Sequence, residues 1–410
     1  MRSIAFGMVL RMAPCRGRAF GPWFRWDSGS EDMTSTKSKD RHHPRILVAL
    51  DWYLPAYRAG GPIRSICNLI ATLGDEFDFR VICGNQDLGQ KEPLPVETST
   101  WHTVGKAQVM YWPQSHWTAT HWQTLLLDLQ PDRLYINSLY SGPFGRLSLK
   151  VAKTLAIPTT LAPRGMLGAG ALSIKPLRKK AWLWLQRATG HLEHITWHAS
   201  TQQEAQEIQR WFPRANIHIA LNLPVPFSPL QPSETGGGIH LLSVGRVHPI
   251  KNYRFGLELA KKLSDQGHDV TYRIVGPIED EAEAHHLNAH SQGVKLEWMG
   301  ATPPQEVQPH FGWSDLVLVP SFNENFGHAV AEGVAHGKPV LVSDQTAWSD
   351  MNPGATVQCL PLDIHTWLDA AATLLAMSPE ECIQSSKATY ENCLLDARHL
   401  AAQRALFNQR

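Results

Sequence analysis

Residues 316–344 constrain the fold most, because they predict a strand, a helix and a second strand in immediate succession. The run LVLV at 316–319 is typical of a buried parallel strand. The helix should begin near Phe326 or Gly327 and end at His336, before a second apolar strand. This order is the repeating unit of an α/β protein, so we expect the N-terminus of the helix at the carboxyl edge of a parallel sheet, where such proteins bind ligands.

The side chains around this helix start suit a nucleotide sugar. Glu324 precedes the helix. Glu332 lies eight positions after Glu324, about two turns into the helix. Glu324 can accept hydrogen bonds from sugar hydroxyls and Glu332 from a ribose diol, while the helix N-terminus attracts phosphate. We therefore predict that Asn325, Phe326, Gly327 and Glu332 bind a donor. The acidic pair by itself fits helix capping and solvation equally well.

A second element upstream favours the ligand-binding interpretation. An apolar strand ends at Gly245, a short loop contains Arg246 and Lys251, and an amphipathic helix starts near Asn252. A diphosphate leaving group can be neutralised without a metal by Arg, Lys and helix N-termini. Taken singly, each cation is an ordinary solvated loop charge. Together with the downstream helix they predict that Gly245 binds the donor, that Arg246 and Lys251 stabilise the departing diphosphate, and that neither metal nor cofactor is required.

The pattern strand–GR–loop–KN, followed by PS-x-x-E-x-FG and a second glutamate, resembles the retaining glycosyltransferases of family 4. The resemblance extends over residues 45–396 and implies a GT-B fold, in which two Rossmann-like domains face each other across a cleft. The N-terminal half resembles a bacterial exopolysaccharide and capsule subgroup. The segments that carry this second resemblance are PAYRAGGPIRSICNLI (55–70), LAPRGMLGAGALSIKPLRKKAW (161–182) and WHASTQQE (197–204).

The family resemblance adds residues from the first half of the chain. It implies that the loop containing Gly60, Gly61 and Arg64 approaches the donor from the opposite domain, although a plain tight turn explains two glycines equally well. Many relatives place a histidine where this chain has Arg164. Arg164 cannot be a general base, because guanidinium stays protonated, so we expect it to bind an acceptor anion or to stabilise the departing diphosphate. His198, inside an apolar run, is more typical of a hydrogen-bonded core residue.

Four segments are predicted along the chain. They are a disordered leader (1–44), a Rossmann-like acceptor-side domain (45–222), a Rossmann-like nucleotide-sugar domain (239–392) and a final helix (393–410), which in this fold crosses back to the first domain. The Pro- and Gly-rich stretch between the two domains is typical of a hinge. The leader is explained as a flexible tail, as a mis-assigned start with Met33 as the natural first residue, or as a weak targeting peptide.

Composition narrows the function class. The formal net charge of +1 gives no argument for a nucleic-acid partner. The six cysteines form no C-x-x-C pair, which favours reduced thiols in a cytoplasmic protein. No stretch approaches eighteen apolar residues, so we predict no membrane-spanning segment. Residues 171–191 are rich in Lys, Arg and Trp. This segment predicts peripheral contact with an anionic membrane, guidance of a lipid-diphosphate acceptor, or an exposed basic helix whose tryptophans face the core.

These observations together predict an enzyme of the hexosyltransferase class. It would move a sugar from a nucleoside diphosphate to a glycan or a polyprenyl-linked acceptor in surface polysaccharide synthesis, with retention at the anomeric carbon as the family resemblance implies. We expect it in the cytoplasm or peripherally at the inner face of the membrane. A nucleotide-sugar epimerase would act on the donor without an acceptor. A catalytically inactive GT-B scaffold would bind the donor without any transfer.

Overall fold

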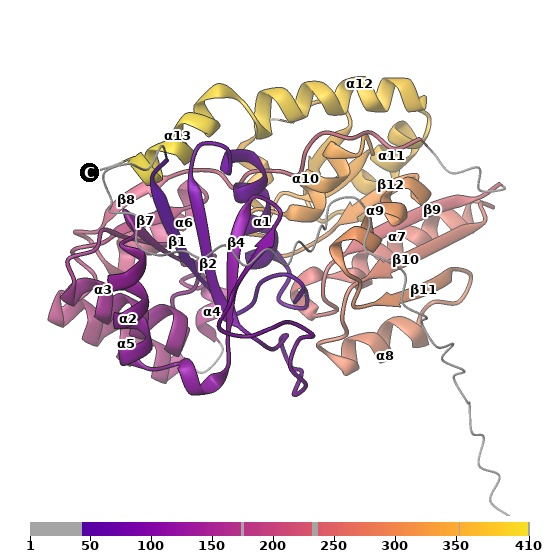
Figure 1. The fold of residues 1–410 in the computed structure, drawn as a ribbon. Coiled ribbons are helices and arrows are strands. Elements are labelled where there is room, and N and C mark those ends of the chain that lie inside the picture. Colours follow the sequence, from indigo (N-terminus) through magenta and orange to yellow (C-terminus); the bar gives the residue numbers. More distant parts are fainter. Residues whose placement is uncertain (1–42, 174–175, 232–236, 352, 409–410) are drawn as a thin grey trace, which may run out of the picture.

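The computed structural model describes residues 43–173, 176–231, 237–351 and 353–408, which form two α/β domains. The strand order is β3-β4-β2-β1-β5-β6-β7-β8 in the first sheet and β11-β10-β9-β12-β13-β14 in the second. Every strand pairing is parallel except that of β3 with β4. Figure 1 shows the two domains side by side. Two parallel sheets with crossover helices agree with the predicted pair of Rossmann-like domains.

The first domain contains eight strands and six α-helices among the described residues. Its strands are β1 (Arg45–Ala49), β2 (Asp78–Gly84), β3 (Trp101–Val104), β4 (Ala107–Trp112), β5 (Arg133–Ile136), β6 (Thr159–Leu161), β7 (Thr196–Ala199) and β8 (Asn216–Ile219). Its helices are α1 (Gly61–Leu73), α2 (Ala119–Leu129), α3 (Ser148–Thr154), α4 (Ala169–Ser173), α5 (Pro176–Thr189) and α6 (Gln202–Trp211). A π-helix, η2 (Gly142–Leu147), leads directly into α3, and a short 3₁₀ turn, η1 (Gln114–His116), precedes α2.

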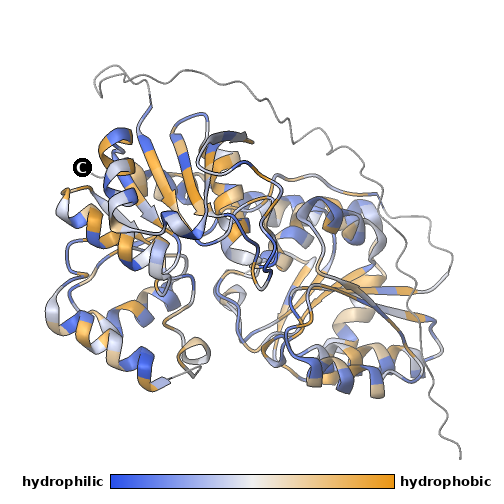
Figure 2. Ribbon diagram, turned by 60° about the horizontal axis from the view of Figure 1, so that its bottom comes forward, coloured by the Kyte–Doolittle hydropathy of each residue, from blue (hydrophilic) through white to orange (hydrophobic). Residues whose placement is uncertain are grey.

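Two hydrophobic cores lie on opposite faces of the first sheet. In β1, Ile46 and Val48 belong to one core, whereas Leu47 and Ala49 belong to the other. Successive side chains of a strand point to opposite faces, so a strand buried on both faces must be apolar throughout. Figure 2 shows the central strands of both domains in the colours of hydrophobic residues. The apolar character of β1 therefore reflects its central place in the sheet.

The second domain repeats this arrangement with six strands. They are β9 (Ile239–Val244), β10 (Val270–Val275), β11 (Lys295–Gly300), β12 (Leu316–Val319), β13 (Val340–Ser343) and β14 (Val357–Leu360). The helices are α7 (Tyr253–Asp265), α8 (Glu281–Ala289), α9 (Pro304–Trp313), α10 (His328–Ala335), α11 (Ile364–Leu375) and α12 (Pro379–Thr389), with the 3₁₀ turns η3 (Pro249–Lys251) and η4 (Ala347–Asp350). Helix α10 starts one residue after Gly327, close to the predicted position.

The C-terminal segment returns to the first domain. After α12, a π-helix η5 (Tyr390–Leu394) leads into α13 (Ala397–Asn408), drawn in yellow along the top of Figure 1. Phe407 packs edge-on against Phe77 and Phe79, with ring centroids 5.4 and 5.7 Å apart. Arg404 forms an ion pair with Glu76 at 2.7 Å. The last helix is thus part of the first domain's core.

Some of the structure was not predicted from the sequence. The antiparallel β3–β4 hairpin forms the edge of the first sheet, and β8 and β14 form two other edges. Edge strands carry polar and half-exposed residues, so they lack the apolar runs that signalled the central strands. No helix in the described ranges has both the length and the apolar character that crossing a bilayer requires. The predicted leader, except for its last two residues, lies outside the described residues.

Candidate active site

The carboxyl edges of the two sheets meet at the loops predicted to bind the donor. Arg64 of α1 forms an ion pair with Glu332 of α10, with 2.5 Å between Nη1 and Oε1. Next to it, the Ser65 hydroxyl lies 3.0 Å from Nε2 of His328. The Asn325 side-chain amide donates to the Ser200 hydroxyl at 2.9 Å. Residues of both domains therefore build one site.

Glu332 is buried, with 4% of the residue exposed. Burial raises the pKa of Glu332 above its ordinary value, and the positive charge of Arg64 lowers it in part. A buried carboxylate is stabilised as an anion only if a cation or several donors face it. In this structure Arg64 supplies that charge, so the carboxylate predicted to hold a ribose is engaged by the opposite domain.

His328, the first residue of α10, is neutral in this site. Burial, together with smaller contributions from the nearby cations Arg64, Arg164 and Lys251, lowers the pKa of His328 to about 3. Its ring packs 4.8 Å from that of Phe326. A neutral imidazole has one donor and one acceptor nitrogen, so it can exchange a hydrogen bond with Ser65 but adds no charge. No local pattern in the chain singled out His328.

Lys251 and Glu324 form the second ion pair of the site. Their Nζ and Oε1 atoms are 2.5 Å apart, and the Ser321 hydroxyl donates to the same carboxylate oxygen at 2.9 Å. A Cβ added at Gly245 would lie 3.0 Å from the Tyr253 hydroxyl and 3.4 Å from Cε of Lys251. The missing side chain at Gly245 therefore makes room for the predicted leaving-group cation.

Arg246 lies apart from this buried pair. Its guanidinium forms an ion pair with Glu279 at 2.8 Å, and 55% of the Arg246 side chain is exposed. Glu279 follows β10, one of the strands whose carboxyl ends form the site. The structure places Arg246 at the solvent-facing rim, in the same loop as Lys251.

Gly327 gives α10 an open N-terminus. It is the N-cap residue, it has a left-handed φ of 76°, and the helix has no side-chain cap. A Cβ added at Gly327 would lie 2.9 Å from Nε1 of Trp348. That indole nitrogen donates to the carbonyl of Phe326 at 2.8 Å, and Phe326 is itself buried. Phe326 thus holds the turn in place with its ring and carbonyl, while the free N–H groups of the first turn remain available to an anion.

The glycine loop of the first domain faces the same helix. Gly60 is the N-cap of α1 with φ of 65°, and a Cβ there would meet nothing within 4 Å. A Cβ at Gly61 would lie 3.5 Å from Cδ2 of His328. Of the two predicted glycines, Gly61 therefore lies against the first residue of α10, whereas no atom of the described residues lies close to the Cβ position of Gly60.

Arg164 has a different environment from the other cations of the site. Its guanidinium donates to Asn137 Oδ1 at 2.6 Å, to the Tyr135 hydroxyl at 2.8 Å and to Asn222 Oδ1. All three partners are neutral oxygens, whereas Arg64, Lys251 and Arg246 each face a carboxylate. The residue also has a left-handed φ of 55°. A rigidly held guanidinium with neutral partners is prepared to bind an anion.

His198 is connected to Arg164 through the hydroxyl of Tyr135, which contacts both side chains. Its Nε2 lies 2.7 Å from the carbonyl of Ala220 and must donate to it, so Nδ1 accepts from the Tyr135 hydroxyl at 2.6 Å. Burial lowers the pKa of His198 to about 3, with a smaller contribution from Arg164. His198 is a neutral, hydrogen-bonded core residue, as its apolar sequence context suggested.

Several site residues were not selected from the sequence. They are Ser65, Asn137, Asn222, Tyr253 and His328. Asn137 directly follows β5, and Tyr253 opens α7 directly after the loop with the cations. A polar residue immediately after a buried strand was the signal available for Asn137. Asn222 and His328 owe their roles to contacts with distant segments, which no local pattern contains.

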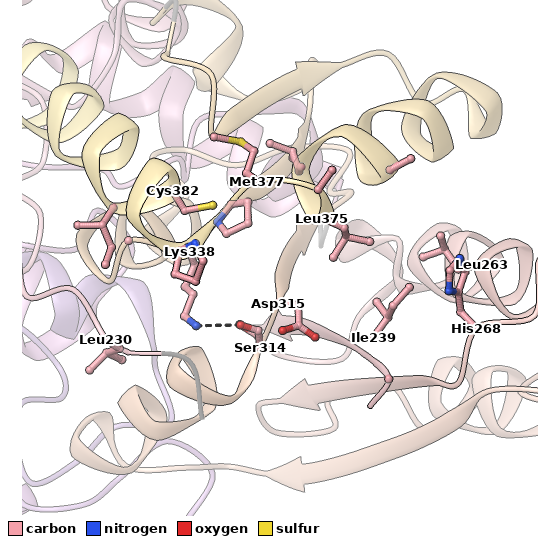
Figure 3. Close-up of a pocket in the computed structure, with 18 of the residues that line it drawn as sticks. Leu230, Ile239, Leu263, His268, Ser314, Asp315, Lys338, Leu375, Met377 and Cys382 are labelled. Carbon is pink, nitrogen blue, oxygen red and sulfur yellow. Dashed lines mark hydrogen bonds between the residues drawn. The ribbon is translucent and has the colours of Figure 1, made fainter. Parts of the chain in front are cut away.

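Cavities also occur away from this site. Figure 3 shows one of about 580 Å³ in the second domain, lined by residues at the starts of β9, β12 and β13. Lys338 reaches into it, and its ammonium donates to the carbonyl of Ser314 at 2.9 Å. The starts of parallel strands lie at the sheet edge opposite the predicted donor site. Within the described residues, no group of three or more His, Cys, Asp or Glu side chains is arranged to hold a metal ion.

A comparison with known protein families matches the second domain. Residues 238–377 match the family model described as "Glycosyl transferases group 1". Over 143 residues the chain is 31% identical to the D-inositol 3-phosphate glycosyltransferase of Corynebacterium glutamicum (strain R). The aligned residues make up 32% of this chain and 34% of that protein. The match thus spans about a third of that relative's length.

Solved structures resemble nearly the whole chain in fold. The sucrose-phosphate synthase from Thermosynechococcus elongatus superposes with a TM-score of 0.60 at 15% identity, covering 89% of this chain and 95% of that one. WaaG, a glycosyltransferase involved in lipopolysaccharide biosynthesis, superposes with a TM-score of 0.57 at 17% identity, covering 88% and 98%. At these identities the likeness establishes the fold alone. The predicted GT-B fold is confirmed, and residues 238–377 within it match the group 1 glycosyltransferase model.

Proposed function

We propose that this protein is a retaining glycosyltransferase of family 4 that transfers a sugar from a nucleoside diphosphate to a glycan or a lipid-linked acceptor. One observation carries the proposal. Glu324, Lys251, Glu332 and the open N-terminus of α10 converge at the carboxyl edge of the second sheet, inside the domain that matches the glycosyltransferase model. Such an edge is where α/β sheets bind nucleotides.

The diphosphate would take the place of the carboxylates that now form ion pairs with the cations of the site. Lys251 and the first N–H groups of α10 would bind the diphosphate, with Arg246 at the rim. Glu332 would accept hydrogen bonds from the ribose, which releases Arg64 to face the diphosphate as well. Charge-assisted hydrogen bonds of this kind are roughly twice as strong as neutral ones. Leaving-group stabilisation would therefore come from the chain's own cations and backbone.

Retention would follow from attack on the same face from which the diphosphate departs. The bond between the anomeric carbon and the phosphate oxygen breaks, and a bond from that carbon to the acceptor oxygen forms. The acceptor's proton goes to the departing phosphate oxygen. In this scheme Glu324, freed from Lys251, orients the donor sugar, and Arg164 stabilises the departing diphosphate or an anionic acceptor. Neither His198 nor His328 is required as a base.

The surface of α5 supports a peripheral contact with an anionic membrane. Leu177 and Trp184 are 84% and 67% exposed and lie seven residues apart, which places them on one helix face. Arg178, Lys180 and Arg187 are exposed on the same helix. Trp182 instead packs on Tyr140, with ring centroids 5.5 Å apart. Trp182 thus faces the core, as expected of an ordinary basic helix, whereas Trp184 faces solvent, as expected of a membrane contact.

Flotation with liposomes that contain phosphatidylglycerol tests this contact. Trp184→Ser should reduce the bound fraction several-fold, because a buried aromatic side chain contributes about 1.5–3 kcal/mol. Met299→Ser, which changes another exposed apolar residue in β11, is the matched control. Equal flotation of Trp184→Ser and wild type would contradict the membrane contact.

A donor and acceptor screen tests the enzymatic proposal. UDP-, GDP- and ADP-sugars are incubated with polyprenyl-phosphate and glycan acceptors, and the anomeric configuration of the product is read by NMR. Transfer with retained configuration supports the proposal. Conversion of the donor sugar without an acceptor would instead identify an epimerase. Donor binding without any transfer would identify an inactive scaffold.

A further inference from the structure

A second cavity, of about 650 Å³, lies in the first domain between the η2–α3 segment and α5. Its size falls in the range of about 300–1,000 Å³ that is usual for ligand sites. The residues that line it are Ser138, Leu139, Gly145, Arg146, Leu149, Lys150, Lys153, Thr154, Leu161, Trp182, Gln186, His191 and Leu192. No sequence motif or comparison assigns a ligand to this cavity.

The cavity has a strong charge asymmetry. Arg146, Lys150 and Lys153 follow one another at spacings of four and three residues, which places them along one face of the continuous η2–α3 helix. All three side chains are exposed, and no lining residue is Asp or Glu. None of the three takes part in an ion pair found among the described residues. Three cations without a carboxylate create a positive field that favours a multiply charged anion.

The rest of the wall is apolar. Leu139, Leu149, Leu161 and Leu192 line the cavity together with the ring of Trp182. Leu161 and Leu192 are buried in the first domain's core, so this apolar wall is held in place by the fold. A simple anion would use only the cationic rim. A ligand with both a phosphate and an apolar chain would use both parts.

The cavity adjoins the predicted site of transfer. Ser138 lines the cavity, and its neighbour Asn137 accepts a hydrogen bond from Arg164 at 2.6 Å. Trp182 lies on α5, the same helix that exposes Leu177 and Trp184 to solvent. The cavity therefore borders both α5, through Trp182, and the residue next to the Asn137 that contacts Arg164.

We propose that this cavity binds the phosphate and the adjoining apolar chain of a lipid phosphate, and so holds the acceptor during transfer. The inference rests on the proposed function for its role in transfer, but ligand binding can be measured without a donor. Arg146, Lys150 and Lys153 contact the phosphate, and the apolar wall with Trp182 contacts the first part of the chain. The acceptor's glycan end then points toward Arg164 and the donor.

Isothermal titration with three probes tests the proposal. The probes are dodecyl phosphate, dodecyl maltoside and inorganic phosphate, each below any micelle-forming concentration. Dodecyl phosphate should bind the full chain at least about 10-fold more tightly than either other probe, and less tightly as salt rises, because charge and apolar contact act together. Equal binding of dodecyl maltoside would mean a merely apolar surface. Equal binding of inorganic phosphate would mean a site for free phosphate. Either result overturns the proposal.

Charge-neutral variants provide the matched comparison. Lys150→Gln with Lys153→Gln should weaken dodecyl phosphate binding by about 10-fold or more, since two charged donors are lost. Both residues are exposed, so the fold should persist. Lys91→Gln with Lys262→Gln removes two exposed lysines elsewhere and should leave binding unchanged. Unchanged binding in the first pair would overturn the proposal.

The proposed function is tested separately on the same samples by UDP, GDP and ADP. These nucleotides should bind all variants equally, because their predicted contacts lie mainly in the second domain. Nucleotide binding without dodecyl phosphate binding would overturn the lipid-phosphate site alone. Dodecyl phosphate binding without nucleotide binding would support that site and count against the proposed donor site.

Discussion

Arg64 and Glu332 form an ion pair that joins the two domains, with 2.5 Å between the guanidinium nitrogen and the carboxylate oxygen. The two residues are 268 positions apart in the sequence. Because Glu332 is also the carboxylate proposed to hold the donor's ribose, donor binding and this interdomain contact compete for one group. Under the proposed function, the pair would therefore couple the relative position of the domains to the occupancy of the donor site.

Lys251→Ala should reduce kcat/KM by about 10²–10³-fold, since one donor aimed at developing charge contributes that much in comparable sites. The variant should still fold, because Lys251 lies in a loop and no apolar core residue is removed. Turnover and thermal unfolding are measured together. Arg254→Ala is the matched control, because it breaks an ion pair with Glu283 of 2.6 Å in the same domain. Near-native turnover of Lys251→Ala would contradict the diphosphate assignment.

Gly327→Ala should lower both stability and nucleotide affinity. The new Cβ would meet Trp348 at 2.9 Å and would force a non-glycine residue into a left-handed conformation. Gly89→Ala is the control, because Gly89 has a similar φ of 73° but no atom within 4 Å of the added Cβ. The control should lose about 1–2 kcal/mol of unfolding free energy from backbone strain alone. Equal effects of the two substitutions on stability and on nucleotide binding would contradict the role assigned to this helix start.

Arg164→Lys should lower kcat/KM by about 10–100-fold. A lysine carries the same charge on the same strained backbone, but its ammonium cannot reproduce the planar contacts to Asn137, Tyr135 and Asn222. Steady-state kinetics with varied donor and acceptor would show the loss. If Arg164→Lys retains turnover within about twofold, only the positive charge matters and the geometric argument fails.

The stability of the protein should depend on pH through His328. Burial lowers the pKa of His328 to about 3 from the ordinary value of 6.5. Between these values the unfolded chain binds a proton that the native protein does not, so the contribution is complete above pH 6.5 and is lost as pH falls. Per pH unit the loss is about 1.4 kcal/mol. His328→Gln should show a correspondingly shallower slope in urea unfolding between pH 6 and pH 4. Parallel slopes for the two proteins would contradict the buried, neutral state of His328.

Features that depend on neighbouring residues along the chain could be predicted from the sequence. The apolar runs of the central strands, the glycine at the start of α10 and the polar residues around it follow from neighbours along the chain. The Lys251–Glu324 pair joins two motifs that the sequence had already selected. By contrast, the contact of Arg64 with Glu332 and that of Arg164 with Asn222 depend on how distant segments are arranged. The edge hairpin β3–β4 lacked an apolar run for a similar reason, because its environment is set by the sheet beside it.

The basic cavity of the first domain is another feature that the sequence did not predict. The sequence singled out the cations of α5, whereas the cavity uses Arg146, Lys150 and Lys153 from the opposite wall. From the segment 171–191, Trp182, Gln186 and His191 line the cavity, and none of the segment's described Lys or Arg side chains does. Which side of a helix faces a neighbouring segment depends on packing, so the charge pattern of α5 did not indicate the basic residues of the η2–α3 segment that line the cavity.

The most direct test of the central claim is calorimetric binding of UDP, GDP and ADP to wild type, Glu332→Gln and Glu283→Gln. Glu283 is a buried, ion-paired carboxylate of the same domain outside the proposed site, so its variant controls for the loss of a buried charge. We predict that one nucleotide binds wild type and Glu283→Gln selectively and binds Glu332→Gln at least about 10-fold more weakly. Absence of binding to folded wild type, or equal binding to all three proteins, would contradict the donor site.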